Sequence, residues 1–214
     1  MLEEFKRKVA ETARDMFEAG LVTSTWGNVS ARVLEPKFIV ITPSGLCKGL
    51  LNSSDMVTMD LDGKIVDGIR KPSSETPMHL AIYRKRPDVN AIIHTHSPFA
   101  TSFAVARVEI PVVEEELAAV VGGSVRVARY AVFGTEKLGR NVCEALGDKN
   151  AVLLQNHGVV TVGHTLKEAY RVAVVVENAA KIFVFSKFIG EPVKIGGRNI
   201  RIIRKNFMEN YPKF

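Results

Sequence analysis

Two apolar runs that each end in a histidine constrain the fold of this chain more than any other feature. The first reads Asn90-Ala-Ile-Ile-His-Thr-His-Ser-Pro98, and the second reads Ala151-Val-Leu-Leu-Gln-Asn-His-Gly158. Short apolar runs bounded by turn residues are typical of buried strands. Side chains two residues apart in a strand point to the same face, so His94 and His96 would lie together. We therefore predict two sheet strands that carry histidines at their ends.

The remaining pattern interleaves helices with short strands. Asp62-Gly63 between two short runs predicts a hairpin, and Thr165-Leu-Lys-Glu168 is a capping box that opens a helix. Such interleaving predicts one α/β domain, residues 1–214, with a mixed, partly antiparallel sheet covered by helices on both faces. The further predicted helices are Leu2–Ala19, Thr76–Lys85, Phe99–Ala106, Thr135–Leu146 and one ending at Gly190, and the further predicted strands are Lys37–Thr42, Met56–Asp60, Lys64–Val66, Ser124–Ala128 and Ile200–Arg204.

Composition and charge argue against several classes of protein. A chain of 214 residues with 46% hydrophobic and 24% charged residues is an ordinary globular protein. The net charge of +6 comes from scattered Lys and Arg, which argues against nucleic acid and suits a small anionic substrate such as a phosphorylated sugar. The long apolar segment 170–188 is interrupted by charges, so we expect no membrane span. Two isolated cysteines and an acidic start predict a cytoplasmic protein.

Three imidazoles and one carboxylate make a candidate metal site. His94, His96 and His157 end predicted strands, and Glu75 follows two serines in a predicted loop. Catalytic zinc sites use three protein ligands and leave one position open, and a displaceable carboxylate would serve as a base. Zinc bound in this way would support enediolate chemistry, which covers aldol cleavage, epimerisation and dehydration. The ligand set alone does not choose among these reactions.

Three short loops have residues suited to binding an anion. Trp26-Gly-Asn-Val29, Thr42-Pro-Ser-Gly45 and Pro72-Ser-Ser-Glu75 offer backbone N–H groups and hydroxyls. Singly, each loop fits an ordinary turn better than an anion site, but together and next to a metal site the three loops favour a phosphate pocket. None matches a nucleotide-binding motif. His79 on the predicted helix is expected to be a buried, hydrogen-bonded histidine rather than a ligand.

Six motifs follow one another along nearly the whole chain. They are Gly27–Ser30, Ile41–Gly45, Pro72–Glu75, the strand that ends at His96, Tyr130–Thr135 and Leu153–Gly158. In this order they resemble the class II aldolase/adducin family, specifically its branch that acts on L-fuculose 1-phosphate. The resemblance implies a three-layer fold with a mixed, mostly antiparallel sheet, and a homotetramer with active sites at subunit interfaces.

The resemblance also implies a role for each motif. It implies reversible, zinc-dependent aldol cleavage of a 1-phosphoketose to dihydroxyacetone phosphate and a short aldehyde such as L-lactaldehyde, through a metal-held enediolate. Phe133 matches a substrate-facing aromatic residue, and Tyr211 matches a C-terminal catalytic tyrosine. The implied ligands of one Zn2+ per subunit are Glu75, His94, His96 and His157, with Glu75 also the acid/base, and the implied phosphate-binding residues are Gly27, Asn28, Ser44, Gly45, Ser73 and Ser74.

One departure from the family pattern keeps other reactions open. The aldolase pattern has a tyrosine after the Ile-Pro pair, where this chain has Glu115 or Glu116, depending on a one-residue gap. In the methylthioribulose-1-phosphate dehydratases of the family, an acidic residue near this position does acid/base chemistry. Glu115 is therefore a candidate catalytic residue, although the run Glu114–Glu116 equally fits a solvated face. Dehydration is the first alternative, pentulose-phosphate 4-epimerisation the second, and a non-catalytic adducin-like assembly module the least favoured.

Overall fold

The computed structural model describes residues 1–33 and 37–210. Among these residues an eight-stranded sheet forms the middle layer, with the strand order β4-β3-β2-β1-β5-β8-β7-β6. Neighbouring strands are antiparallel except β6 and β7, which are parallel, so the predicted mixed, mostly antiparallel sheet is confirmed. The strands are β1 Asn28–Val33, β2 Phe38–Ile41, β3 Val57–Asp60, β4 Ile65–Asp67, β5 Ala91–Thr95, β6 Val127–Ala128, β7 Ala151–Leu154 and β8 Gly158–Gly163.

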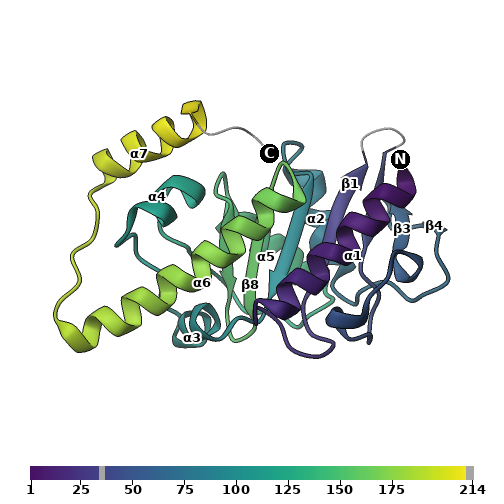
Figure 1. Cartoon of the computed structure of the whole chain (residues 1–214), viewed down its shortest axis with the longest axis horizontal. Coiled ribbons are helices and arrows are strands. Elements are labelled where there is room, and N and C mark those ends of the chain that lie inside the picture. The colour runs from purple at the N-terminus through teal and green to yellow at the C-terminus, as the bar shows by residue number, and fades with distance from the viewer. Residues whose placement is uncertain (34–36, 211–214) are drawn as a thin grey trace.

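Helices cover both faces of this sheet, which confirms the predicted three-layer fold. Helices α1 and α6 lie in front of the sheet in Figure 1, together with α3, whereas α2 and α5 lie behind it. No helix of the described ranges is long and apolar enough to cross a membrane. The helices are α1 Leu2–Glu18, α2 Thr76–Lys85, α3 Pro98–Ala106, α4 Glu115–Val121, α5 Glu136–Leu146, α6 Leu166–Ile189 and α7 Gly197–Asn210, with short 3-10 turns at η1 Lys48–Leu50 and η2 Ser53–Asp55.

The packing of β7 explains why all four of its residues are apolar. Ala151 and Leu153 pack in the cluster that contains α3 and α6, whereas Val152 and Leu154 pack in the cluster that contains α2 and α5. Successive side chains of a strand point to opposite faces, so a strand covered on both sides must be apolar at every position. The run therefore predicted a central strand correctly.

Two predicted helix starts are confirmed by their caps. The hydroxyl of Thr135 accepts a hydrogen bond from the backbone N–H of Leu138, and that of Thr165 accepts one from the backbone N–H of Glu168. The carboxylate of Glu168 accepts from the N–H of His164, one residue before the position expected in a capping box. These hydroxyls satisfy N–H groups that a helix leaves without partners in its first turn.

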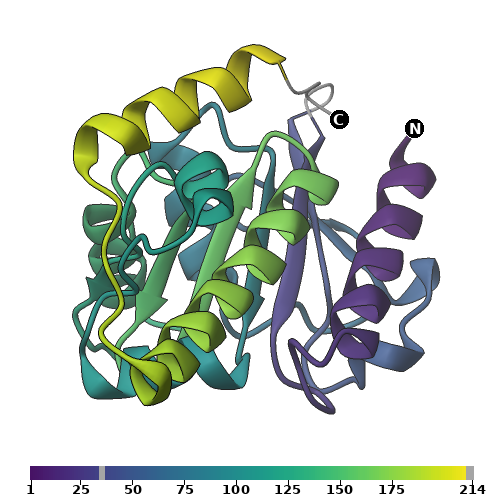
Figure 2. The same ribbon diagram turned by 60° about the vertical axis from the view of Figure 1, so that its left-hand side comes forward.

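The predicted strand Ile200–Arg204 is wrong, because these residues lie within α7. Ile200, Ile203 and Phe207 recur at the helical spacing and pack against the cluster that includes α4. Figure 2 shows α7 running beside the short helix α4. A five-residue window rich in isoleucine resembles a strand, and only the longer window reveals the helix.

Strand β1 and helix α4 are two of the elements that appear where the sequence predicted none. Strand β1 begins in the polar stretch near Gly27, because the polar side chains of Asn28 and Ser30 find buried partners on α2. Helix α4 follows Glu114, whose carboxylate accepts from the N–H groups of Glu116 and Leu117. Both elements depend on polar contacts, which hydrophobic periodicity does not register.

Candidate metal centre and phosphate loops

Four side chains converge at one end of the central strands. Glu75 is the N-cap residue of α2, His94 lies in β5 and His96 follows that strand, and His157 lies in the turn between β7 and β8. Their ligand atoms all lie within 4.8 Å of one another. Strand β8 pairs with β5, and this pairing places the turn that carries His157 beside His94 and His96.

Two glycines allow the backbone to close around the histidines. A Cβ on Gly158 would lie 2.3 Å from the carbonyl oxygen of Thr95, and a Cβ on Gly27 would lie 2.8 Å from that of His94. Neither position has room for a larger residue. These close approaches explain why a glycine follows His157 and another precedes Asn28 in the sequence.

The nitrogen and oxygen atoms of the cluster face one another closely. The Nε2 atoms of His94 and His96 are 2.9 Å apart, and Nε2 of His94 is 3.0 Å from Oε2 of Glu75. Nε2 of His157 lies 3.4 Å from the other carboxylate oxygen. Nδ1 of His94 donates to the carbonyl oxygen of Val159 at 2.8 Å, which leaves the lone pair of Nε2 directed into the cluster.

Burial and the neighbouring charges shift the pKa of each group in the cluster. Burial, and then the charges of the neighbouring histidines, lower the pKa of His96 to about 3 and that of His157 to about 4. Burial alone would raise the pKa of Glu75, but His94, His157 and Asn28 hold it below its usual range. Burial alone would lower the pKa of His94, but the ionised carboxylate of Glu75 raises it. At neutral pH the cluster therefore combines an ionised carboxylate with neutral His96 and His157, the forms of these groups that bind metal.

One carboxylate oxygen of Glu75 indicates what the cluster accommodates. Oε1 is buried and has no hydrogen-bond partner among the described residues. A buried charged oxygen without a partner is costly, and a cation beside it would remove that cost. Three imidazole nitrogens and one carboxylate oxygen fit a divalent metal such as zinc.

The three predicted anion-binding loops are tied side by side. The N–H of Ser44 donates to the carbonyl of Lys71 at 2.9 Å, and that of Ser73 donates to the carbonyl of Thr42 at 3.1 Å. Thr42 in turn exchanges hydrogen bonds with Val29 in β1. Ser44, Gly45 and Ser74 are exposed, whereas the hydroxyl of Ser73 accepts from the N–H of Glu75.

A buried lysine that the sequence analysis did not single out joins two of these loops. Nζ of Lys48 donates to the carbonyls of Thr25 at 2.8 Å and Leu46 at 3.1 Å, and its backbone N–H donates to that of Ser24. Burial lowers the pKa of Lys48 to about 8. The available signal was a lysine three residues after the Pro-Ser-Gly loop, within the run Leu46-Cys-Lys-Gly-Leu50.

The remaining predicted residues lie farther along the surface or outside the described ranges. Phe133 is exposed, and its neighbour Gly134 lies against Ser74, since a Cβ there would be 2.9 Å from the Ser74 carbonyl oxygen. Glu115 lines a cavity between α4, α6 and α7 that none of the four clustered residues lines. Glu116 lines the same cavity. Tyr211 lies outside the described residues.

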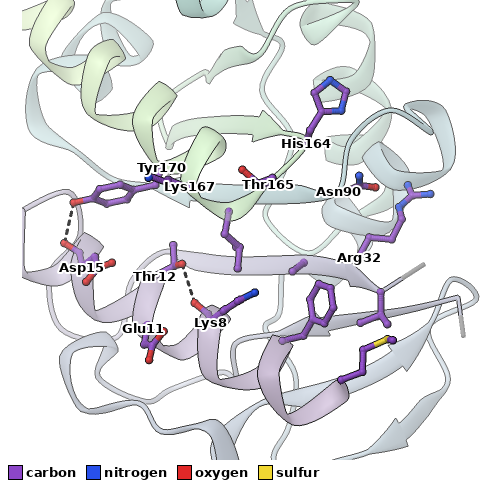
Figure 3. A pocket seen from close by; sticks show the side chains of 15 residues that line it. Lys8, Glu11, Thr12, Asp15, Arg32, Asn90, His164, Thr165, Lys167 and Tyr170 are labelled. Carbon is purple, nitrogen blue, oxygen red and sulfur yellow. Dashed lines mark hydrogen bonds between the residues drawn. The ribbon is translucent and has the colours of Figure 1, made fainter. Parts of the chain in front are cut away.

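A second cavity, of about 740 Å³, is also separate from the cluster (Figure 3). It lies between α1 and the start of α6, and its lining includes Lys8, Arg32 and His164. The hydroxyl of Tyr170 closes one side by donating to the carbonyl of Asp15 at 3.4 Å. None of the four clustered residues lines this cavity.

Comparisons with known proteins agree with this geometry. Residues 7–184 match the family model described as the class II aldolase and adducin N-terminal domain, and the chain belongs to this family. A 5-deoxy-D-ribulose 1-phosphate aldolase of Bacillus thuringiensis is 38% identical over 213 residues, which cover 100% of this chain and 96% of the relative. A 5-methylthioribulose-1-phosphate/5-deoxyribulose-1-phosphate aldolase of Rhodospirillum rubrum is 40% identical over 182 residues, covering 85% of this chain and 81% of the relative.

A solved structure supports the same assignment. An L-fuculose 1-phosphate aldolase superposes with a TM-score of 0.92 at 37% sequence identity, and the match covers 96% of each chain. The resemblance predicted from the six motifs is therefore confirmed, and so is the enzyme class of a sugar-phosphate aldolase, a carbon–carbon lyase.

Proposed function

We propose that this chain holds one zinc ion through Glu75, His94, His96 and His157 and reversibly cleaves a 1-phosphoketose to dihydroxyacetone phosphate and a short aldehyde. The observation that carries this proposal is the buried, unpartnered oxygen Oε1 of Glu75 among three imidazoles, beside loops rich in hydroxyl and N–H groups. The donor set favours zinc over harder cations, which prefer all-oxygen sites.

Glu75 would act as the acid/base of the reaction. A bound divalent metal would supply Lewis-acid stabilisation of negative charge on substrate oxygens. In cleavage the C4 hydroxyl of the ketose loses its proton and becomes the aldehyde carbonyl, the bond between C3 and C4 breaks with its electron pair remaining on the C2–C3 side, and C3 must then gain a proton. In the synthetic direction the same proton is removed. Glu75 is ionised and lies at the cluster, which suits it to move this proton when the substrate carbon is within hydrogen-bond reach.

The three tied loops would bind the substrate phosphate. Exposed Ser44, Gly45 and Ser74 lie on loops that are hydrogen-bonded side by side, and backbone N–H groups in such loops form anion sites. We also assign Ser73 and Gly27 to this pocket. The side-chain amide of Asn28 is occupied by Glu75 and His79, so we propose that Asn28 contributes to the site mainly as a partner of Glu75.

The preferred substrate is proposed to be 5-deoxyribulose 1-phosphate, with L-fuculose 1-phosphate second. The two named relatives that act on 5-deoxyribulose 1-phosphate are 38% and 40% identical to this chain, against 37% for the L-fuculose 1-phosphate aldolase structure. Both substrates have a methyl group at the end of the chain opposite to the phosphate. Cleavage of either gives dihydroxyacetone phosphate and a short aldehyde.

We further propose a cytoplasmic homotetramer in which a neighbouring subunit completes each site. Glu115 lines a cavity without the metal cluster of its own chain, so a catalytic role requires it to act in a neighbour's site. Phe133 would be a substrate-binding residue of this site, and Tyr211 a further catalytic residue. Glu115 also keeps dehydration of methylthioribulose 1-phosphate as the alternative reaction.

The experiment measures turnover by purified, metal-analysed protein. The substrates are 5-deoxyribulose 1-phosphate, L-fuculose 1-phosphate and methylthioribulose 1-phosphate. We expect dihydroxyacetone phosphate from 5-deoxyribulose 1-phosphate, complete loss of activity with a chelator, recovery with zinc, and no covalent trapping by borohydride. Activity after complete chelation would refute the metal mechanism. Water loss from methylthioribulose 1-phosphate, without cleavage of the other two compounds, would assign the chain to the dehydratases.

A further inference from the structure

A chain of hydrogen bonds runs from Glu75 into the core. Nδ2 of Asn28 donates to Oε2 of Glu75 at 3.0 Å, and Oδ1 of Asn28 is 2.6 Å from Nε2 of His79. Nδ1 of His79 is 2.6 Å from the hydroxyl of Ser30, which is 2.8 Å from the hydroxyl of Tyr83. These five residues are buried, with exposed fractions between 0% and 6%. The chain therefore has no contact with solvent to compete for its hydrogen bonds.

Two backbone periodicities build this chain. Asn28 and Ser30 are two residues apart in β1 and so share one face of the sheet. Glu75, His79 and Tyr83 are four residues apart along the start and body of α2, so they share one face of the helix. The strand and the helix thus bring two matched rows of polar side chains together in an otherwise apolar core.

The carboxylate at one end sets the direction of every hydrogen bond. Ionised Glu75 only accepts, so the Asn28 group that faces it must be the NH2 group. The carbonyl oxygen of Asn28 then faces His79, and Nε2 of His79 must carry the hydrogen. In the neutral ring Nδ1 accepts from Ser30, and the hydroxyl of Ser30 accepts from Tyr83. One tautomer of His79 satisfies the whole chain.

We infer that His79 is a positioning residue: its Nε2–H locks the Asn28 amide with the NH2 group toward Glu75, and this holds the carboxylate with Oε1 directed into the metal cluster. This inference rests on the proposed role of Glu75. Without the Nε2–H donor, the carbonyl oxygen of Asn28 loses its buried partner, and the amide can rotate and carry Nδ2 away from Oε2 of Glu75. His79 never touches the substrate and acts only through Asn28.

Two substitutions of nearly equal size separate positioning from simple packing. In His79→Gln the amide nitrogen lies near the place of Nε2, so the donor to Asn28 is kept. In His79→Asn the shorter amide lies near Nδ1, so the contact with Ser30 is kept and the donor to Asn28 is lost. A residue that only fills space would respond alike to both changes. Thr161→Val is the matched control, because it removes a fully buried hydroxyl, bonded to the Ala169 carbonyl, from strand β8, which does not pair with β1.

Steady-state kinetics of the zinc-loaded full chain test the inference. We expect His79→Asn to lower kcat by about 10- to 100-fold, the usual effect of removing a group that orients a metal ligand, with little change in KM. His79→Gln should lose less than about 10-fold. Thr161→Val should keep the wild-type kcat. Equal kcat values in His79→Gln and His79→Asn, whether low or unchanged, would overturn the positioning role.

A second measurement needs neither turnover nor a variant that folds. Long-range proton–nitrogen NMR spectra of the histidine rings in metal-free wild-type protein report the tautomer of His79 directly. We expect the neutral Nε2–H form at neutral pH, and the Nδ1–H form would overturn the inference. A wild-type protein that cleaves no sugar phosphate but shows the Nε2–H form would refute the proposed function while leaving the hydrogen-bond chain intact.

Discussion

The metal centre and the layer formed by α4 and α7 are built in opposite ways. Around the metal centre, Glu75 and His94 are buried, and buried partners such as Asn28 fix their orientation. In contrast, α7 has no buried residue among those described and packs on α4 through half-buried Ile203 and Phe207. Polar groups excluded from water need defined partners, whereas a half-exposed apolar contact tolerates small shifts. We therefore expect substitutions at the centre to affect catalysis and substitutions in α7 to affect mainly local stability.

The largest effect is expected at Glu75. Glu75→Gln should lower kcat by about 100- to 10,000-fold, the usual contribution of a general acid or base. The three imidazoles remain, so the variant should still bind zinc, as measured by metal analysis after dialysis. A variant with zinc bound and kcat near the wild-type value would remove Glu75 from its proposed role.

The next effect concerns Lys48 and is a dependence of stability on pH. Burial lowers its pKa from 10.5 in the unfolded chain to about 8, so between these values the unfolded state binds more protons and the Lys48 contribution to stability rises with pH. The free energy of unfolding of the wild type, relative to Lys48→Met, should rise by about 3 kcal/mol from pH 8 to 10.5. Denaturant titrations at both pH values measure this difference. If the free energy of unfolding changed equally with pH in both proteins, the pKa of Lys48 would not be lowered by folding.

A smaller effect is expected at the start of α4. If Glu115 acts in a neighbouring subunit, Glu115→Gln should lower kcat by about 100-fold. This is the lower end of the range that a general acid or base contributes to the rate. Glu116→Gln is the matched control on the same helical turn and should keep the wild-type kcat. Kinetics of the two variants show whether Glu115 or Glu116 occupies the position of the family's tyrosine. Unchanged rates in both variants would make Glu114–Glu116 a solvated face.

The smallest effect is expected in α7. Ile203→Ala removes half-buried side-chain atoms from the contact with α4 and should lower the free energy of unfolding by about 1–2 kcal/mol, below the usual cost at a fully buried site. Its kcat should match the wild type, as measured alongside the denaturant titration. A loss of kcat comparable to that of Glu75→Gln would show that α7 shapes the active site as strictly as the metal centre does.

The same contrast explains which features were predictable from the sequence. His94 and His96 share a face because strands repeat every two residues, and the glycine after His157 marked a turn, so local patterns indicated the cluster. Strand β1 and the bond between Asn28 and His79 escaped prediction, because their partners are far apart in the sequence and polar. The reading of Ile200–Arg204 as a strand failed because the apolar face of α7 becomes visible only over the longer window to Phe207.

Exchange of hydrogen for deuterium at dihydroxyacetone phosphate tests the central role of Glu75 most directly. The measurement follows, by NMR in heavy water and without any aldehyde, the hydrogen on the hydroxymethyl carbon that becomes C3 of the ketose. Wild-type protein and Glu75→Gln are compared at equal zinc content. We expect the wild type to exchange one hydrogen and Glu75→Gln to exchange none above the uncatalysed rate. Exchange by Glu75→Gln at the wild-type rate would contradict the account.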